Sequence, residues 1–242
     1  MITPEMLSDR GANQRAGDRQ LPAAVVFDCD GLLVDSTAAW TTAFDEAAAA
    51  VSFELDNAMR MRLLGSSVAS GAARIARWSK QANENGLIAS VLHQSLRRAV
   101  RLDPPRVMPG AAALLADLSG SVPMAVASNS PSDVLVEMLT GAGLDVAFDA
   151  TIAADDVDLP KPHPEVYLTA CSALAVDPRD AVAVEDSRIG AIAAQRAGLA
   201  VVIVTTGDWP ESAPLPWPAE GRPVLVTSSL TEPAVIRQLM PS

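Results

Sequence analysis

Short apolar runs alternate with helical patterns along most of the chain, and this alternation limits the folds that are open to it. The runs that read as buried strands lie at residues 23–28, 122–128, 150–155, 180–186 and 197–205. The later runs are each separated from the next by a segment with the apolar spacing of a helix. Strands that alternate with helices favour a parallel sheet with helices on both of its faces. The sequence therefore predicts a doubly wound α/β domain.

One segment, residues 37–106, breaks the alternation. It is rich in alanine and in helix formers, and it contains no convincing strand. We therefore expect a helical cap domain inserted into a core domain that comprises residues 21–36 and 107–242. Residues 1–20 are polar and carry both charge signs, so a flexible tail is expected, and the proline-rich residues 207–223 are expected to form a surface loop.

The composition restricts the partners and the compartment. No stretch approaches the roughly 20 apolar residues of a membrane helix, and the first residues lack a secretion signal, so we expect a cytoplasmic protein without a membrane partner. The net charge of −11 argues against nucleic acid as a partner, which requires a basic surface. Cys29 and Cys171 stand apart without a metal-binding spacing, so neither zinc nor a disulfide is expected. The sequence leaves the oligomeric state open, and a monomer is compatible with it.

Polar residues that suit catalysis follow the predicted strands. Residues 27–36 read FDCDGLLVDS, so that two carboxylates and a glycine come directly after the first strand. In an open parallel sheet, ligands bind outside the carboxyl ends of the strands, and residues after different strands are therefore expected to share one site. The candidates are Asp28, Asp30, Gly31, Ser128, Asn129, Lys161, Glu185 and Asp186.

Four segments resemble, in order and spacing, the four motifs of the haloacid dehalogenase-like superfamily. They read FDCDGLLVDS, AVASNS, KPHPEVY and VEDSRIGAIAAQRAG, and the resemblance spans residues 23–205. It is strongest for the phosphatase and phosphomutase branch, which carries a helical cap after the first motif. The resemblance implies a Rossmann-like core, a small phosphorylated metabolite as the substrate, magnesium as the cofactor and an aspartyl-phosphate intermediate.

The same resemblance implies three catalytic residues. Asp28 would be the nucleophile, while Asp30 would protonate the leaving alcohol and then take a proton from the attacking water. A carboxylate that meets a phosphate dianion at about 4 Å faces a repulsion of roughly 8 kcal/mol at an effective dielectric constant of about 20. Magnesium must offset that repulsion, and Lys161 would neutralise the charge that develops in the transition state.

Ligands for the metal and for the phosphate are also implied by the resemblance. Magnesium prefers oxygen ligands, which the carboxylates of Asp28 and Asp186 and the backbone carbonyl of Asp30 would supply. Glu185 would bind the metal directly or through water. The residues implied to bind the phosphate are Ser128, Asn129 and Lys161.

Asp30 and Trp40 limit the types of reaction that the resemblance leaves open. Dehalogenases of the superfamily lack the second acidic residue of the first motif, so Asp30 favours phosphoryl transfer. Mutases that resemble β-phosphoglucomutase typically carry a histidine at the place of Trp40 and an arginine after a Gly-x-Ser element of the cap. Here Gly65-Ser66-Ser67 has no arginine after it. Hydrolysis is therefore predicted, and a sugar phosphomutase is the alternative.

A phosphometabolite-binding protein without turnover is a third possibility, but such a protein is expected to have lost one of the motif residues, and none is missing. The predicted cap carries a net charge of +3. Its arginines could recognise the anionic or hydroxylated end of the substrate, or they could be solvated on the outer face. We expect a small sugar or polyol phosphate as the substrate.

Overall fold

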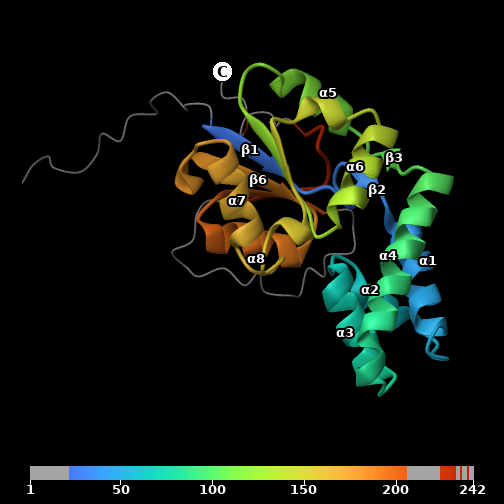
Figure 1. Ribbon diagram of the computed structural model, residues 1–242. Helices are drawn as coiled ribbons and strands as arrows, with labels where there is room; N and C mark the ends of the chain where they lie inside the picture. The colour runs from blue at the N-terminus through green and yellow to red at the C-terminus, as the bar shows by residue number, and fades with distance from the viewer. Residues whose placement is uncertain (1–21, 206–223, 233–234, 236–238, 240–242) are drawn as a thin grey trace, which may run out of the picture.

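The structure of the protein, a computed structural model, describes residues 22–205 and 224–232 together with residues 235 and 239. A six-stranded parallel sheet with the order β5-β4-β1-β6-β7-β8 forms its centre (Figure 1). The predicted tail and the predicted loop at 207–223 lie outside the described residues. The strands are β1 (Ala24–Phe27), β4 (Met124–Ala127), β5 (Ala150–Ile152), β6 (Ala181–Glu185), β7 (Ala200–Val204) and β8 (Val224–Thr227).

Helices cover both faces of the sheet. Along β1, Val25 and Phe27 pack into the hydrophobic cluster that includes the helices α5 and α6, and Ala24 and Val26 pack into the cluster of α7 and α8. Because both faces are buried, the whole strand is apolar. The predicted Rossmann-like fold is therefore confirmed. The helices are α5 (Ala111–Leu118), α6 (Ser132–Gly141), α7 (Glu165–Ala173) and α8 (Arg188–Ala197).

The strand order reverses at β1, which pairs with β4 on one side and with β6 on the other. Phe27 aligns with Val126 of β4 and with Val184 of β6. The residues that follow these three strands therefore emerge together at one edge of the sheet, where open α/β folds bind their ligands.

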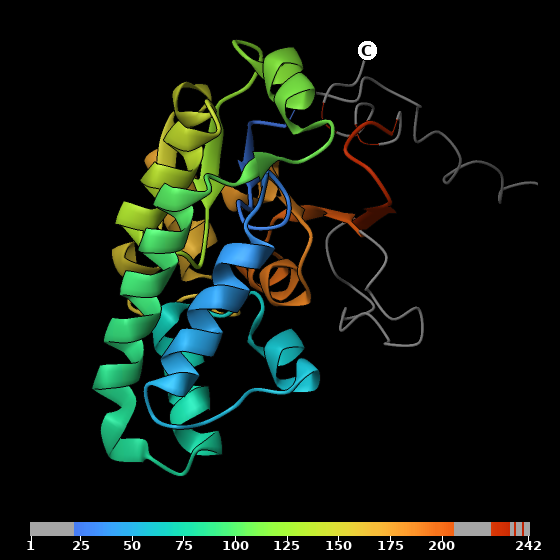
Figure 2. The same ribbon diagram turned by 90° about the vertical axis from the view of Figure 1, so that its right-hand side faces the viewer.

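Residues 37–102 form four helices, called the four-helix segment below. They gather at one end of the sheet (Figure 2), and α1 and α3 both pack against α4. A two-stranded antiparallel ribbon of β2 (Val34–Asp35) and β3 (Arg106–Val107) joins the segment to the rest of the chain. The helices are α1 (Thr37–Ala49), α2 (Asn57–Leu63), α3 (Val68–Trp78) and α4 (Asn85–Leu102). Short 3-10 turns are η1 (Ala82–Glu84), η2 (Asp145–Ala147), η3 (Ala154–Asp156) and η4 (Pro178–Asp180).

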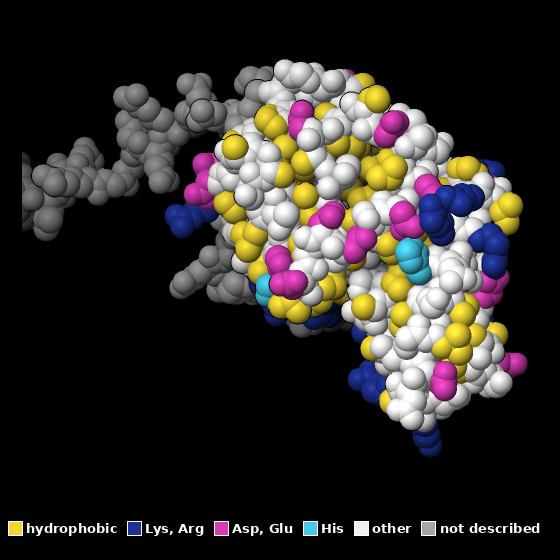
Figure 3. Space-filling model, viewed as in Figure 1, with side chains coloured by type: hydrophobic (Ala, Val, Ile, Leu, Met, Phe, Trp, Pro, Cys, Tyr) yellow, Lys and Arg dark blue, Asp and Glu magenta, His cyan; other side chains and the backbone are white. Residues whose placement is uncertain are grey.

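Ion pairs join α4 to α6. Glu137 on α6 accepts hydrogen bonds from Arg97 Nε at 2.9 Å and from Arg101 Nη2 at 2.6 Å. His93 Nε2 lies 2.8 Å from an oxygen of Asp133. Basic and acidic side chains gather over this contact on the face seen in Figure 3.

None of the helices in the described part of the chain is long and apolar enough to cross a membrane.

Candidate active site

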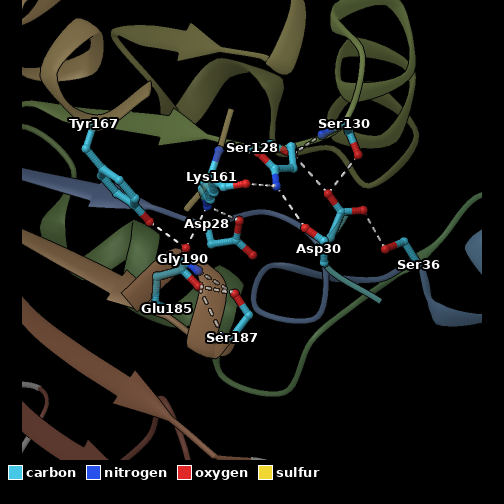
Figure 4. Close-up of polar contacts among 12 residues, drawn as sticks. Asp28, Asp30, Ser36, Ser128, Ser130, Lys161, Tyr167, Glu185, Ser187 and Gly190 are labelled. Atoms are coloured by element: carbon cyan, nitrogen blue, oxygen red, sulfur yellow. Dashed lines mark hydrogen bonds and ion pairs between the residues drawn. The ribbon is translucent and has the colours of Figure 1, made fainter. Parts of the chain in front are cut away.

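Three carboxylates and one amine meet at the edge of the sheet. Asp28 follows β1, while Glu185 ends β6 and Asp186 follows it, and one oxygen of each lies within 4.8 Å of the others. Lys161 Nζ lies 2.6 Å from Asp28 Oδ1 and 2.6 Å from Glu185 Oε1 (Figure 4). The side chains of these three residues are almost fully buried. A single amine therefore faces a cluster with more negative charge than it can balance.

The carboxylate of Glu185 is fully engaged with protein donors. Oε1 accepts the Lys161 amine and, at 2.6 Å, the hydroxyl of Tyr167. Oε2 accepts the backbone N–H of Ser187 at 3.2 Å and its hydroxyl at 3.0 Å. The hydroxyl of Ser187 also caps α8 by accepting the N–H of Gly190. Glu185 is thus fixed by four hydrogen bonds and holds Lys161 in place.

The carboxylate of Asp186, by contrast, is incompletely satisfied. Its Oδ1 is buried without a hydrogen-bond partner among the described residues, although a buried polar atom normally has one. Gly31 makes room for this carboxylate, because a Cβ on Gly31 would stand 2.2 Å from Asp186 Oδ2. An unpartnered oxygen beside the carboxylate of Asp28 is the hard donor set that divalent cations such as magnesium prefer. The residues therefore fit a divalent cation.

The carboxylate of Asp30 points to a different set of donors. Oδ1 accepts the hydroxyl of Ser36 at 2.6 Å and the indole N–H of Trp40 at 2.9 Å. Oδ2 accepts the hydroxyls of Ser128 at 2.9 Å and Ser130 at 2.8 Å (Figure 4). Four donors fix the orientation of this carboxylate.

A cavity of about 160 Å³ lies between the sheet edge and the four-helix segment. The Asn129 amide spans the two sides, because its Nδ2 donates to the carbonyl of Gly65 at 2.8 Å. The residues that line the cavity from the sheet side are Asp28, Asp30, Gly31, Asn129, Lys161, Asp186 and Ser187. Those that line it from the other side are Ser36, Thr37, Trp40, Leu64, Gly65 and Ser66.

Comparison with known proteins places this site in a family. The family model of the haloacid dehalogenase-like hydrolases matches residues 22–198 of the chain. The chain belongs to this family. The prediction from the four motifs is therefore confirmed.

Three curated relatives of this hydrolase are phosphatases. The chain is 34% identical in sequence to hexitol phosphatase B of Escherichia coli, and the match covers 77% of this chain and 84% of that protein. It is 31% identical to the fructose-1-phosphate phosphatase YqaB of Escherichia coli over 75% of this chain and 96% of that protein. The match to validoxylamine A 7'-phosphate phosphatase of Streptomyces hygroscopicus is 46% identical but covers 35% of this chain and 40% of that relative. The predicted class, a phosphoric monoester hydrolase, is confirmed.

A solved structure of β-phosphoglucomutase from Clostridium difficile has the same fold as this hydrolase. The TM-score between the two structures is 0.76, and the match covers 90% of this chain and 96% of the β-phosphoglucomutase chain. At 22% identity the likeness shows the fold alone. It therefore does not favour a mutase over a phosphatase.

Burial and like charges shift the ionisation of the carboxylates in this hydrolase. Burial raises the pKa of Asp28 to about 8, the charge of Glu185 adds to the rise, and Lys161 opposes it. Burial also raises the pKa of Asp186 well above its ordinary value, as do the charges of Asp28 and Glu185. Burial lowers the pKa of the Lys161 amine, but the carboxylates of Asp28 and Glu185 raise it by more, so the net shift is upward. A bound cation would favour the charged carboxylates.

All the side chains that the sequence singled out lie at this edge of the sheet, and their individual roles stay predictions. Ser128 differs most from expectation, because its hydroxyl binds Asp30 and the residue is absent from the described lining of the cavity. The described lining also contains no arginine. Sequence reasoning missed Ser130 and Tyr167, which lie inside the motifs AVASNS and KPHPEVY. Their positions in those motifs were the available signal.

Proposed function

We propose that this hydrolase removes phosphate from small sugar or polyol monophosphates through phospho-Asp28, with magnesium as its cation. The observation that carries the proposal is the pairing of Asp28 with Lys161 beside the unpartnered oxygen of Asp186. The cavity that these residues line is also lined by Asp30, so a nucleophile and a proton-transfer group face the same space.

In the first step, a carboxylate oxygen of Asp28 attacks the phosphorus while the bond to the leaving oxygen breaks. Lys161 holds Asp28 Oδ1 at 2.6 Å, so the nucleophile enters the reaction with a fixed orientation and its charge partly balanced. Asp30 gives its proton to the leaving alcohol, and to carry that proton it needs one of the serine hydroxyls that donate to it in the structure to turn away. In the second step, Asp30 takes a proton from water, which attacks the phosphorus and releases phosphate and the Asp28 carboxylate.

A divalent cation, when bound, would supply the positive charge that lets a carboxylate approach a phosphate dianion. We assign its retention to the carboxylates of Asp28 and Asp186 and to the backbone carbonyl of Asp30. Glu185 would bind it only through water, because both of its oxygens already accept two hydrogen bonds from the protein.

The side chains that line the cavity favour a substrate whose alcohol part carries hydroxyl groups and no second charged group. Of the described residues that line it, Lys161 alone has a cationic side chain, and that side chain already faces two carboxylates. The four-helix segment offers Trp40, Leu64 and Ser66 instead. A second phosphate or a carboxylate would find no counter-charge there and would lose its water shell, which is unfavourable. Hydroxyl groups meet no such penalty. The names of the two Escherichia coli relatives agree with this class.

A substrate panel tests the proposal. Phosphate release would be measured with magnesium for hexitol phosphates, fructose 1-phosphate, phosphoglycolate and fructose 1,6-bisphosphate. The proposal predicts higher kcat/KM for the first two, and loss of all activity with EDTA. A preference for the carboxylated or doubly phosphorylated ester would contradict the assignment of the substrate, and full activity in EDTA would contradict the role of the cation.

We also propose that the chain comprises a core of residues 21–36 and 107–242 and a cap of residues 37–106. The ribbon of β2 and β3, which pairs Asp35 with Arg106, lies at both of these boundaries and supports the division.

A further inference from the structure

We propose that Trp40 is a positioning residue that holds Asp30 for proton transfer. The inference rests on the proposed role of Asp30 as the acid and base. It goes beyond that role because it assigns the orientation of Asp30 to a residue of the four-helix segment.

The first argument is the way in which the Asp30 carboxylate joins two parts of the molecule. Oδ2 is bound by hydroxyls that follow β4, those of Ser128 and Ser130. Oδ1 is bound by Ser36, directly before α1, and by Trp40 within α1. A carboxylate offers about four acceptor positions, so each donor restricts a different rotation of the group. Loss of one donor to Oδ1 leaves that oxygen restrained by a single hydroxyl.

The second argument is that the indole of Trp40 is itself fixed. The backbone N–H of Trp40 donates to the carbonyl of Ser36 at 3.0 Å, in the first turn of α1. The side chain is buried, and its ring centroid lies 5.2 Å from that of Phe44, one turn further along the same helix. Gly71 on α3 approaches the Phe44 ring closely, because a Cβ there would stand 3.1 Å from it. The N–H of Trp40 therefore has a defined direction.

The third argument is chemical. An indole N–H donates a hydrogen bond and accepts none, whereas a serine hydroxyl can do either. Trp40 can therefore orient Asp30 through both of its protonation states without taking a proton from it. Packing alone would require neither the indole nitrogen nor its approach to Asp30 Oδ1 at 2.9 Å.

The variant Trp40→Phe tests the inference, because it retains an aromatic ring against Phe44 and removes the N–H donor together with part of the indole ring. General acid–base catalysis contributes about 10²–10⁴-fold, and we expect the variant to lose about tenfold of it in kcat/KM for a hexitol phosphate. For p-nitrophenyl phosphate, whose leaving group needs little protonation, kcat/KM should change by less than about twofold, because kcat/KM reports only the steps up to phospho-Asp28. Equal losses with the two esters, or no loss with either, would overturn the inference.

Two further variants make the test decisive. Trp78→Phe on α3 is the matched control, because Trp78 is partly buried and does not line the described cavity, and it should change kcat/KM for neither ester. Ser36→Ala removes the other donor to Oδ1 and should give the same selective loss. Its hydroxyl makes no capping bond to α1, so the helix start is retained. If Trp40→Phe does not fold, equal losses in Ser36→Ala would overturn the inference.

The variant Asp30→Asn separates this inference from the proposed function. A selective loss in Asp30→Asn with equal losses in Trp40→Phe would overturn the role of Trp40 and leave the role of Asp30 intact. Equal losses in Asp30→Asn would overturn the proton-transfer role itself, and the inference with it.

Discussion

The substitution Gly190→Ala is expected to break the hydrogen bonds between Glu185, Lys161 and Tyr167 although it replaces no charged residue. Gly190 lies in the first turn of α8, and a Cβ there would stand 1.7 Å from Glu185 Oε1. The alanine must therefore displace a fully buried carboxylate oxygen that accepts hydrogen bonds from Lys161 and Tyr167. Hydrogen bonds to charged groups contribute about 1.5–3 kcal/mol each, so loss of two lowers the free energy of unfolding by about 3–6 kcal/mol.

Equilibrium unfolding in urea, followed by circular dichroism, would measure this loss. Gly86→Ala is the matched control, because Gly86 is exposed on α4 and a Cβ there meets nothing within 4 Å. Alanine in that helix should stabilise the protein by up to about 1 kcal/mol. Phosphatase activity should fall in Gly190→Ala alone, since Lys161 loses one of its two carboxylates. A loss below about 1 kcal/mol, the value of a single weak contact, would refute the reasoning about Glu185.

Three further predictions concern proton transfer, the contact between α4 and α6, and the reaction type. Asp30→Asn should reduce kcat/KM for alkyl phosphates by about 10²-fold or more and spare kcat/KM for p-nitrophenyl phosphate, as steady-state kinetics would measure. A hydrogen bond from Arg101 lowers the pKa of Glu137, so its contribution to stability is present above about pH 5 and is lost as the pH falls through the lowered pKa. Glu137→Gln should therefore lower the free energy of unfolding by up to about 1 kcal/mol at neutral pH and by less in acid, and urea titrations at several pH values would check this. With β-glucose 1-phosphate and a trace of the 1,6-bisphosphate, phosphorus NMR should detect inorganic phosphate as the main product, whereas clean conversion to glucose 6-phosphate would establish a mutase.

The central strands could be predicted from the sequence because both faces of the sheet are covered. Burial on both faces makes β1 and β6 continuous apolar runs, which stand out against the helical spacing between them. The ribbon of β2 and β3 could not be predicted, since two residues per strand carry no periodicity. The edge strand β8 was also missed, although Val224–Thr227 is an apolar run, because it follows a proline-rich stretch instead of a helical pattern.

The composition of the site could be predicted, but the partners of its side chains could not. The motif residues had to lie together, because parallel strands bring their carboxyl ends to one edge. The hydroxyl of Ser128 points to Asp30, which depends on a side-chain rotation that no sequence pattern specifies. The same holds for Trp40, whose ring packs against Phe44 while its indole N–H points to Asp30.

The most direct test of the account is to look for the phosphorylated carboxylate. The enzyme would be quenched with acid during turnover of a hexitol phosphate with magnesium, digested, and examined by mass spectrometry. The account predicts a phosphoryl group on Asp28 in the wild type and none in Asp28→Asn, whose turnover should fall by orders of magnitude because the uncatalysed hydrolysis is so slow. A phosphoryl group on another residue, or an Asp28→Asn variant that turns over near the wild-type rate, would contradict it.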